Sequence, residues 1–329
     1  MTAPSSIPRK WLAAALTLPL FIVWSNSFVA IGFLVGAEGT PARFDYIEYS
    51  VARYVTAGII CGLYCLIWRL RESLQIIAKH WGRLLLCGFV MVPGYNLSLA
   101  YAQANGVSAS VASLTTALNP LFTMVLSVLF LQEKIQLKHF LGLSVAFLGM
   151  LTIGSAERPN SSIPYNLALV LVSTAPLSWA ILSVATKAVS KHVSPVLWTL
   201  LSIGFGGAML LPFAGRESVY SLIKLDQAGW LALSYLIIPC TIVGFVAWIW
   251  LLQHFSATQM GFTVFLNPPL TALSKMLLSA FFPAVFIFQI QPREWIGGSI
   301  VLLGMAIALV GKQSFPPRST NCHQTGDNA

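Results

Sequence analysis

Long apolar runs separated by short polar segments extend along almost the whole chain. A membrane-spanning α-helix needs about 20 consecutive apolar residues, because each residue adds about 1.5 Å to its length. Ten runs meet or approach that length, at residues 11–34, 47–68, 84–102, 107–131, 140–155, 165–186, 193–214, 227–252, 256–282 and 295–311. The pattern therefore predicts an all-α integral membrane protein with ten transmembrane helices.

Composition agrees with a membrane protein and excludes two other classes. Hydrophobic residues make up 57% of the 329 residues, only 9% are charged, and the mean hydropathy is +0.77. Soluble domains are about 25% charged, and disordered chains have low hydrophobicity, so neither class fits. The net charge of +9 would suit nucleic acid, but the basic residues stand at the ends of apolar runs. We therefore predict the lipid bilayer, and no nucleic acid, as a partner.

The basic residues also predict the orientation of the chain, since Lys and Arg in short loops stay on the cytoplasmic side. With a cytoplasmic N-terminus, twelve of the 19 basic residues fall inside, five outside and two within spans. We therefore predict that residues 1–10 and a disordered tail, 313–329, are both cytoplasmic. The run at 11–34 is too long for a removable signal peptide and is expected to remain as a span.

An internal repeat divides the chain into two halves. Residues 108–123 align with residues 256–271 at a shift of 148, with seven identities in sixteen positions, including a shared Leu-Asn-Pro. The following spans align at a shift of 155, which leaves an apolar insertion at 280–292. Five spans per half, an odd number, place the second copy upside down in the membrane. We predict two inverted five-helix repeats, 11–156 and 157–312, around a central cavity, as in many secondary transporters.

Repeat-related polar residues and prolines form the first candidate substrate site. Each of two asparagines shares a helical face with a threonine and precedes a proline, which interrupts helical hydrogen bonding. Backbone groups freed inside a membrane must be satisfied by protein or water. The substrate-binding candidates are Thr115, Asn119, Thr263 and Asn267, and the structural or gating candidates are Pro120, Pro268 and Pro269. Hydrogen bonds between closely packed helices are the alternative interpretation.

Two cations lie within predicted spans, where a charge costs roughly 3 kcal/mol or more. Lys275 is predicted to hold an anionic group of the substrate, with snorkelling to the external interface as the alternative. Arg53 is predicted to make a structural contact, either an ion pair with Glu48 near the outer end of the second span or a hydrogen bond to a backbone carbonyl. No Asp or Glu lies deep in a span, and Glu133 is expected at the cytoplasmic interface, so the sequence offers no clear proton relay.

Aromatic residues within the spans complete the candidate site. Trp24 and Trp179 occupy repeat-related positions, 155 residues apart, and could line a cavity for an apolar or aromatic substrate. Tyr95, Tyr101 and Trp248 are added to the substrate-binding candidates, with ordinary packing as the alternative. The five cysteines and five histidines are scattered without metal-ligand spacing, so we predict neither a metal nor a cofactor.

Over residues 11–312 the chain resembles the EamA-like family of the drug/metabolite transporter superfamily. The resemblance is carried by Trp24-Ser-Asn-Ser-Phe-Val-Ala, Arg53, Pro120, Glu133, Gly142, Gly149, Trp295-Ile-Gly-Gly298 and Gly304. It implies a ten-helix inverted-repeat carrier of the cell inner membrane that exports amino acids and other small metabolites, usually with an ion gradient. The chain departs from the family in one respect, since the second half has no glutamate matching Glu133.

The hypothesis from the sequence is a secondary transporter that moves a small organic metabolite, an amino acid or related solute, by alternating access and in the direction of export. A carrier for phosphorylated or nucleotide-linked anions, resting on Lys275 and Arg53, and a channel-like facilitator are the alternatives. The sequence contains no His-Glu-x-x-His or Gly-x-Ser-x-Gly motif and no paired acids within a span, so we do not expect an enzyme. The coupling ion and the oligomeric state, monomer or homodimer, stay open.

Overall fold

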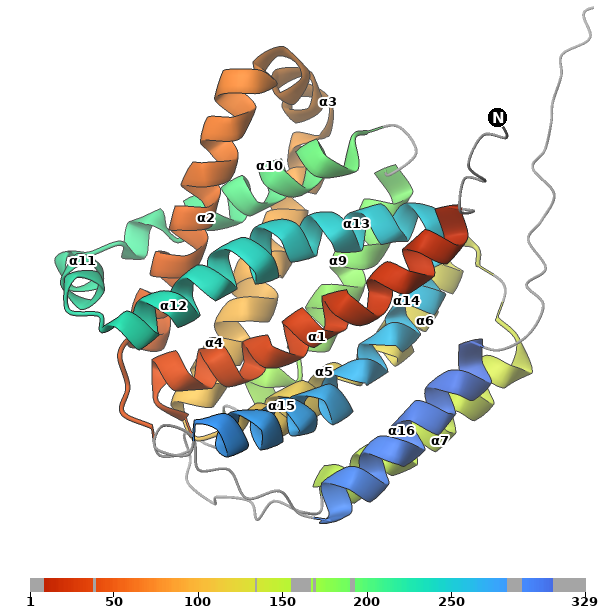
Figure 1. The fold of residues 1–329 in the computed structure, drawn as a ribbon. Helices are drawn as coiled ribbons and strands as arrows, with labels where there is room; N and C mark the ends of the chain where they lie inside the picture. The colour runs from red at the N-terminus through yellow and green to blue at the C-terminus, as the bar shows by residue number, and fades with distance from the viewer. Residues whose placement is uncertain are drawn as a thin grey trace, which may run out of the picture.

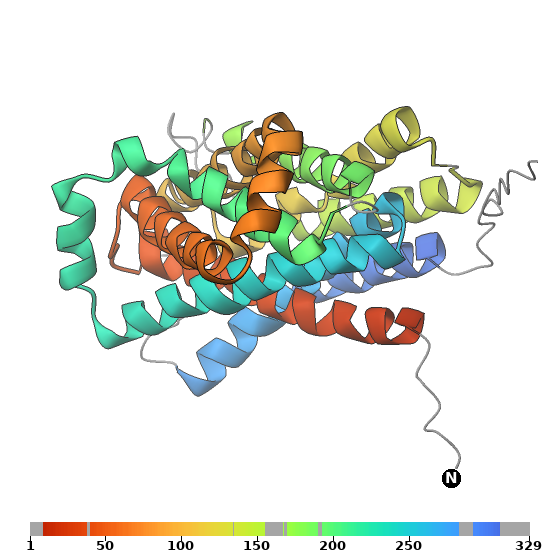
Figure 2. The same cartoon turned by 90° about the horizontal axis from the view of Figure 1, so that it is seen from above.

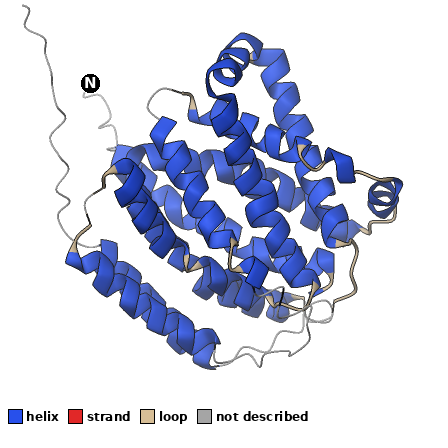
Figure 3. Cartoon of the chain, turned by 180° about the vertical axis from the view of Figure 1, so that it is seen from behind, coloured by secondary structure: helices blue, strands red, loops and turns tan. Residues whose placement is uncertain are grey.

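The computed structural model describes residues 9–37, 40–133, 135–154, 167, 170–189, 193–282 and 292–309. These residues form helices joined by loops, and none of them belongs to a strand (Figure 3). The predicted all-helical fold class is therefore confirmed for this part of the chain. The predicted tail, 313–329, lies outside the described residues, as do residues 1–8 and most of the apolar insertion.

The helices follow one another in the order that the apolar runs predict (Figure 1). Those before residue 160 are α1 (Arg9–Val35), α2 (Tyr46–Trp68), α3 (Leu70–Phe89), the π-helix η2 (Val90–Leu97), α4 (Ser98–Ala104), α5 (Ala109–Thr116), α6 (Asn119–Leu131) and α7 (Leu137–Gly154). Those after it are α9 (Ala175–Val189), α10 (Pro195–Ala208), η3 (Leu211–Phe213), α11 (Arg216–Ile223), α12 (Gln227–Tyr235), the π-helix η4 (Leu236–Val243), α13 (Gly244–His254), α14 (Ala257–Thr263), η5 (Val264–Leu266), α15 (Asn267–Phe281) and α16 (Pro292–Leu309).

Seven helical segments in the described ranges are long and apolar enough to cross a membrane. They are Ala15–Val35, Tyr46–Trp68, Leu70–Ala104, Ala109–Leu131, Val170–Val189, Pro195–Phe213 and Gln227–His254. Two shorter apolar helices, Leu137–Gly149 and Trp295–Ala308, coincide with the fifth and tenth predicted spans. The ninth predicted span corresponds to three consecutive elements, α14, η5 and α15. The predicted third span begins at Leu84; α3 begins at Leu70 but is kinked at His80, so the part of the helix that holds this span begins just after the kink.

Two helices widen into a π-helix around an internal proline. Pro93 is the fourth residue of η2, and Pro239 is the fourth residue of η4. Proline has no N–H, and its ring clashes with the carbonyl four residues earlier in an α-helix. The wider π turn accommodates the ring, and such segments are frequent at functional sites. The two prolines lie 146 residues apart, close to the repeat shift, and the sequence analysis did not identify this pair.

The helices α7 and α16 pack along each other as a pair at one side of the bundle (Figure 1). Glycines permit this approach, because a Cβ added to Gly142 would lie only 2.5 Å from the carbonyl oxygen of Gly304. One added to Gly149 would lie 2.6 Å from the carbonyl oxygen of Gly297. Small residues at close helix contacts are typical of membrane bundles, where van der Waals packing drives association.

An ion pair joins the loop after α1 to the start of α12, near the edge of the bundle at which α11 projects (Figure 2). Arg43 donates from Nε and Nη2 to the two carboxylate oxygens of Asp226, at 2.8 and 2.9 Å. Asp226 also caps α12, because its Oδ1 accepts from the N–H of Gly229 at 3.0 Å. Hydrogen bonding to Arg43 is the main reason why the pKa of the Asp226 carboxyl is lowered to about 2.

This lowered pKa predicts a pH-dependent contribution to stability. The stabilisation is present above the pKa of an unfolded aspartate, about 3.9, and is lost as the pH falls toward 2. We expect Asp226→Asn, which keeps a capping oxygen without the charge, to be less stable than the wild type near neutral pH. The difference is at most about 1 kcal/mol because the aspartate is half exposed. Thermal unfolding in detergent should show the difference shrinking at pH 3, and an unchanged difference would contradict the assignment.

Candidate functional site

The fourth and ninth predicted spans are both interrupted inside the bundle. In the fourth, α5 ends and α6 begins at Asn119; in the ninth, α14 passes into the 3₁₀-helix η5 and α15 begins at Asn267. Pro120, Pro268 and Pro269 occupy the first turn of the new helices, where a missing N–H breaks no intrahelical bond. The prolines therefore start a second helix in each span, whereas the sequence predicted that they interrupt a continuous one.

A small central cavity lies beside these interruptions. Its volume is about 30 Å³, which is room for about one or two water molecules. Aromatic, amide, hydroxyl and guanidinium groups share its wall. The lining residues are Phe21, Trp24, Ser27, Phe28, Arg53, Tyr95, Asn96, Thr116, Asn119, Trp179, Phe245, Val264 and Asn267.

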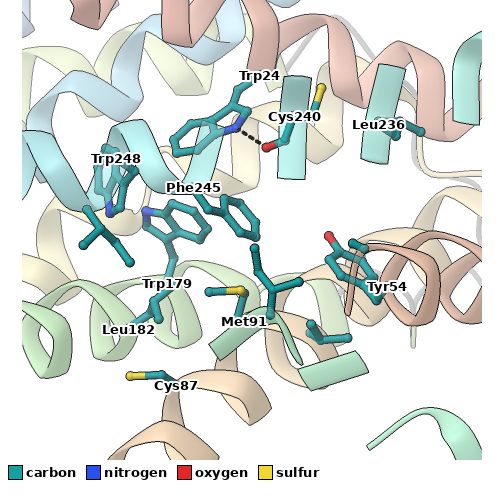
Figure 4. Packing of buried hydrophobic residues seen from close by; sticks show 14 of the residues in the cluster. Trp24, Tyr54, Cys87, Met91, Trp179, Leu182, Leu236, Cys240, Phe245 and Trp248 are labelled. Atoms are coloured by element: carbon teal, nitrogen blue, oxygen red, sulfur yellow. Dashed lines mark hydrogen bonds between the residues drawn. The ribbon is translucent and has the colours of Figure 1, made fainter. Parts of the chain in front are cut away.

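Two tryptophans from the two halves of the chain form part of this wall (Figure 4). The rings of Trp24 and Trp179 lie edge to face, with centroids 5.2 Å apart, and Tyr95 packs on Trp179 at 4.9 Å. A hydrogen bond of 3.0 Å from Trp24 Nε1 to the carbonyl oxygen of Cys240 in η4 fixes the first indole. Trp248, 5.4 Å from Trp179 and 1% exposed, does not line the cavity and supports the wall from behind.

The two candidate asparagines face the cavity and also join helices. Asn119 donates from Nδ2 to the carbonyl oxygen of Pro176 in α9 at 3.2 Å. Asn267 Oδ1 accepts from Ser25 Oγ of α1 at 3.3 Å. These bonds agree with the alternative interpretation, hydrogen bonding between packed helices. The geometry therefore allows both roles at once, because each amide lines the cavity while it holds an interrupted helix in place.

Thr115 and Thr263 do not line the cavity, in contrast to the prediction. Each donates to the carbonyl oxygen three residues earlier in its own helix, at 2.8 and 2.6 Å. The adjacent residues Thr116 and Val264 line the cavity in their place. The prediction assumed an unbroken helix, in which residues four apart share a face. The interruption before each asparagine changes the helical phase, so the face turned to the cavity shifts by one residue.

Arg53 lines the cavity, but its predicted ion pair with Glu48 is wrong. Its Nη1 donates to Tyr49 Oη at 2.7 Å, and its Nε donates to Thr241 Oγ1 in η4 at 2.9 Å. Residues five apart lie about 140° apart around a helix, whereas residues four apart are neighbours. Glu48 therefore points elsewhere, and its Oε2 accepts from Ser221 Oγ of α11 at 2.8 Å.

Two further candidates lie away from the cavity. Tyr101 packs edge-on against Tyr46, with ring centroids 5.1 Å apart, and does not line the cavity. Lys275 is 4% exposed, and its Nζ donates to Ser110 Oγ of α5 at 3.0 Å. The ammonium group is therefore buried between α15 and α5, and it does not snorkel to an interface.

Glu133 makes a comparable contact at the other end of the α5–α6 pair. Its Oε1 accepts from the N–H of Ala257 at 2.9 Å, and its Oε2 accepts from the N–H and the Oγ1 of Thr258 at 3.2 and 2.7 Å. A carboxylate in this place satisfies free N–H groups of α14 and faces the positive end of the helix dipole. Ser110 and Thr258 are 148 residues apart, and each is the second residue of its helix.

A lysine binds the helix that precedes α14. Lys187, in the last turn of α9, donates from Nζ to the carbonyl oxygens of Leu252 and Phe255 at the end of α13. A cation at a helix C-terminus faces the negative end of the dipole. Opposite charges, Lys187 and Glu133, therefore hold the two sides of the short connection between α13 and α14.

Several cavity residues were not among the sequence candidates. They are Phe21, Ser27, Phe28, Asn96, Thr116, Phe245 and Val264. A signal for two of them was present, because Phe21 and Phe28 lie three residues before and four residues after Trp24, on the same helical face. Asn96 lies in η2, whose π-helical geometry changes the face of the helix and is not readable from apolar periodicity.

Comparisons with known proteins cover nearly the whole chain. The model of the EamA-like transporter family matches residues 16–155 and again residues 166–310. An "Uncharacterized transporter" of Archaeoglobus fulgidus is 26% identical over 302 residues, which cover 92% of this chain and 99% of the relative. A "Probable amino-acid metabolite efflux pump" of Escherichia coli strain K12 is 25% identical over 234 residues, which cover 66% of this chain and 76% of the relative. A solved crystal structure shares the fold, with a TM-score of 0.63 at 16% identity over 90% of this chain and 96% of the other.

Proposed function

Because this chain belongs to the EamA-like transporter family, it is a membrane transporter, and we propose that it is a secondary transporter that moves a small organic metabolite across the cytoplasmic membrane by alternating access. We propose an amino acid or a related solute as the cargo, moved outward, and the name of one relative, an amino-acid metabolite efflux pump, supports this choice. In this proposal ten helices form two inverted repeats, 11–156 and 157–312, with both termini in the cytoplasm. Separate matches of the family model to the two halves support the repeat.

The observation that carries the proposal is a central cavity with a polar contact between helices beyond each end of it. Glu133 binds Thr258 at the start of α14, and Lys275 binds Ser110 at the start of α5. Lys275 lies eight residues beyond the cavity residue Asn267, which is about 12 Å along a helix. The cavity between the two contacts has a volume of about 30 Å³, which is too small for a metabolite, so in this proposal one contact opens before the solute binds.

The two contacts use equivalent positions of the sequence repeat with opposite charges. Ser110 and Thr258 correspond at the shift of 148, yet one receives the ammonium group of Lys275 and the other the carboxylate of Glu133. Opening one contact while the other stays closed exposes the cavity to one side, as alternating access requires. The second half of the chain has no glutamate that matches Glu133. In this proposal the contact of Lys275 with Ser110 closes the end of the cavity at which that glutamate would stand.

We expect Glu133→Gln to open the cytoplasmic end of the transporter and Lys275→Met to open the outer end. Each change removes a charged hydrogen-bonding group, a loss of about 1.5–3 kcal/mol, which corresponds to about tenfold or more in the balance between closed and open forms. The reporter is Thr116→Cys on the cavity wall, labelled with a membrane-impermeant maleimide in right-side-out and inside-out vesicles. Glu133→Gln should raise the labelling rate from the cytoplasmic face, and Lys275→Met should raise it from the outer face.

Two controls make the labelling experiment decisive. Glu217→Gln removes a carboxylate from the exposed side of α11 and should leave both labelling rates unchanged. The protein without Thr116→Cys gives the background from the native cysteines. Labelling that does not change from either face in either variant would contradict the two contacts as gates.

A further inference from the structure

We propose that Arg53 binds the carboxylate group of the transported solute, so that the substrates are monocarboxylates with an apolar body, amino acids among them. The inference rests on the proposed function and adds the chemical class of the cargo to it. Its basis is a guanidinium group on the cavity wall whose hydrogen-bond partners in the described part of the chain are neutral hydroxyl groups.

Arg53 has hydrogen-bond donors left over for a ligand. A guanidinium group carries five N–H groups, and the described residues accept from two of them, one on Nε and one on Nη1. One N–H on Nη1 and two on Nη2 remain. The residue is only 3% exposed and lines the cavity, so a ligand in the cavity can accept from these N–H groups. Two adjacent N–H groups of a guanidinium match the two oxygens of a carboxylate.

The neighbours of Arg53 fix the orientation of its side chain. Thr241 donates its own proton to the carbonyl oxygen of Leu236 at 2.8 Å, so its oxygen faces Arg53 as an acceptor. Tyr49 binds from the preceding turn of α2, and the ring of Tyr54 lies 4.8 Å from Cζ of the guanidinium group. A side chain held in this way loses little conformational entropy when a ligand binds, which favours affinity.

In the described part of the chain, no carboxylate forms an ion pair with Arg53. Two ion pairs of the described residues, Arg43 with Asp226 and Arg69 with Glu72, involve other cations and are exposed in part. A charged side chain inside a membrane bundle is costly, and such groups usually face a cavity or a substrate pathway. A carboxylate that enters the cavity with the solute would supply the missing negative charge.

The other residues of the cavity wall determine which chemical groups the solute can carry besides its carboxylate. Trp24 and Trp179 offer apolar area to the body of the solute, and indole faces also attract an ammonium group. Lys275 is not among the lining residues, and Arg53 is the single cation among the described residues that line the wall. One positive charge balances a carboxylate but not a phosphate dianion. The wall therefore favours monocarboxylates over the phosphorylated or nucleotide-linked cargo of the alternative hypothesis.

Isothermal titration of the full chain in detergent tests this inference. The probes are L-leucine, L-phenylalanine, 4-methylpentanoate and 3-phenylpropanoate, each beside its carboxamide, with 3-phosphoglycerate as the phosphorylated probe. We expect carboxylates to bind at least about tenfold more tightly than their carboxamides, since hydrogen bonds to charged groups contribute about 1.5–3 kcal/mol. Equal affinity of acids and amides, binding of 3-phosphoglycerate alone, or binding of no carboxylate would each overturn the inference.

Variants at Arg53 assign the effect to this side chain. We expect Arg53→Met to lower carboxylate affinity at least about tenfold, and Arg53→Lys to lower it less, because lysine keeps the charge without the fork of N–H groups. Arg216→Met, on the exposed start of α11, is the matched control and should bind as the wild type does. If Arg53→Met does not fold, the affinities of the wild type for carboxylates and for their carboxamides still test whether the protein binds a carboxylate group. Vesicle labelling of Thr116→Cys needs no solute, so it can succeed, and the proposed function stand, while this inference fails.

Discussion

Replacing Trp24 with alanine is expected to lower the free energy of unfolding by about 3–5 kcal/mol and to abolish saturable transport. The indole is 8% exposed, packs against the rings of Phe21, Trp179, Phe245 and Trp248, and donates to the carbonyl oxygen of Cys240. Its removal would leave a hole in the cavity wall and remove the hydrogen bond to the Cys240 carbonyl oxygen. Thermal unfolding in detergent and counterflow in proteoliposomes measure the two effects.

Two further variants separate packing from hydrogen bonding at this position. Trp24→Phe keeps a ring in the wall but removes the N–H, and the loss of this hydrogen bond should cost about 0.5–1.5 kcal/mol. Trp81→Ala removes a tryptophan of α3 that is 62% exposed, so it should change the unfolding temperature in detergent little. If Trp24→Ala were as stable as Trp81→Ala, the cluster would not hold the two halves together.

Replacing Gly304 with leucine is expected to separate α16 from α7 and to prevent recovery of folded protein. A Cβ at this position would lie 2.4 Å from the backbone nitrogen of Ala146 and 2.6 Å from the carbonyl oxygen of Gly142. Both atoms belong to the backbone, so no side chain can rotate away to make room. Alanine should already cost about 1–3 kcal/mol, which is typical of overpacking, and size-exclusion chromatography after heating measures the loss.

Gly62→Ala is the matched control for Gly304→Ala. Gly62 lies within α2, and a Cβ added there would meet no atom within 4 Å. Alanine at that position should stabilise the helix by about 0.5–1 kcal/mol, because glycine loses more conformational entropy on folding. The two alanine variants are therefore expected to shift the unfolding temperature in opposite directions. Equal shifts would mean that the close contact of α7 with α16 does not limit stability.

The helical segments could be predicted from the sequence because the length of an apolar run is a local property. The helix over Tyr46–Trp68, for example, matches the run at 47–68 within a residue at its start. The pairing of Trp24 with Trp179 could also be anticipated, because the two residues correspond in the sequence repeat. The glycines that were found through the family resemblance, Gly142 and Gly304, prove to lie against each other.

The interruptions of two spans could not be placed from the sequence. A proline in an apolar run predicts a disturbed helix, but the chain can bend there or begin a new helix. Which of the two occurs at Pro120 depends on tertiary contacts such as the bond from Asn119 to Pro176, 57 residues away. A change of helical phase by one residue was enough to exchange Thr115 for Thr116 in the cavity wall.

The hydrogen-bond partners of the two buried cations were the part of the site that the sequence predicted least well. Thr241 is 188 residues from Arg53, and Ser110 is 165 residues from Lys275, so no local spacing indicates either bond. Sequence proximity favoured Glu48 as the partner of Arg53, but the geometry of a helix places those two side chains on different faces. Charge alone identified the two cations, and only the fold separated the one in the cavity from the one outside it.

The small volume of the cavity also bears on the electrical insulation of the membrane. Each elementary charge that crosses a membrane releases about 2.3 kcal/mol per 100 mV of potential, and a continuous file of water through a transporter would let protons make that crossing. A space of about 30 Å³ walled by tryptophan and phenylalanine rings holds about one or two water molecules, not a file of them. In this conformation the cavity therefore does not itself hold a water file along which protons could cross.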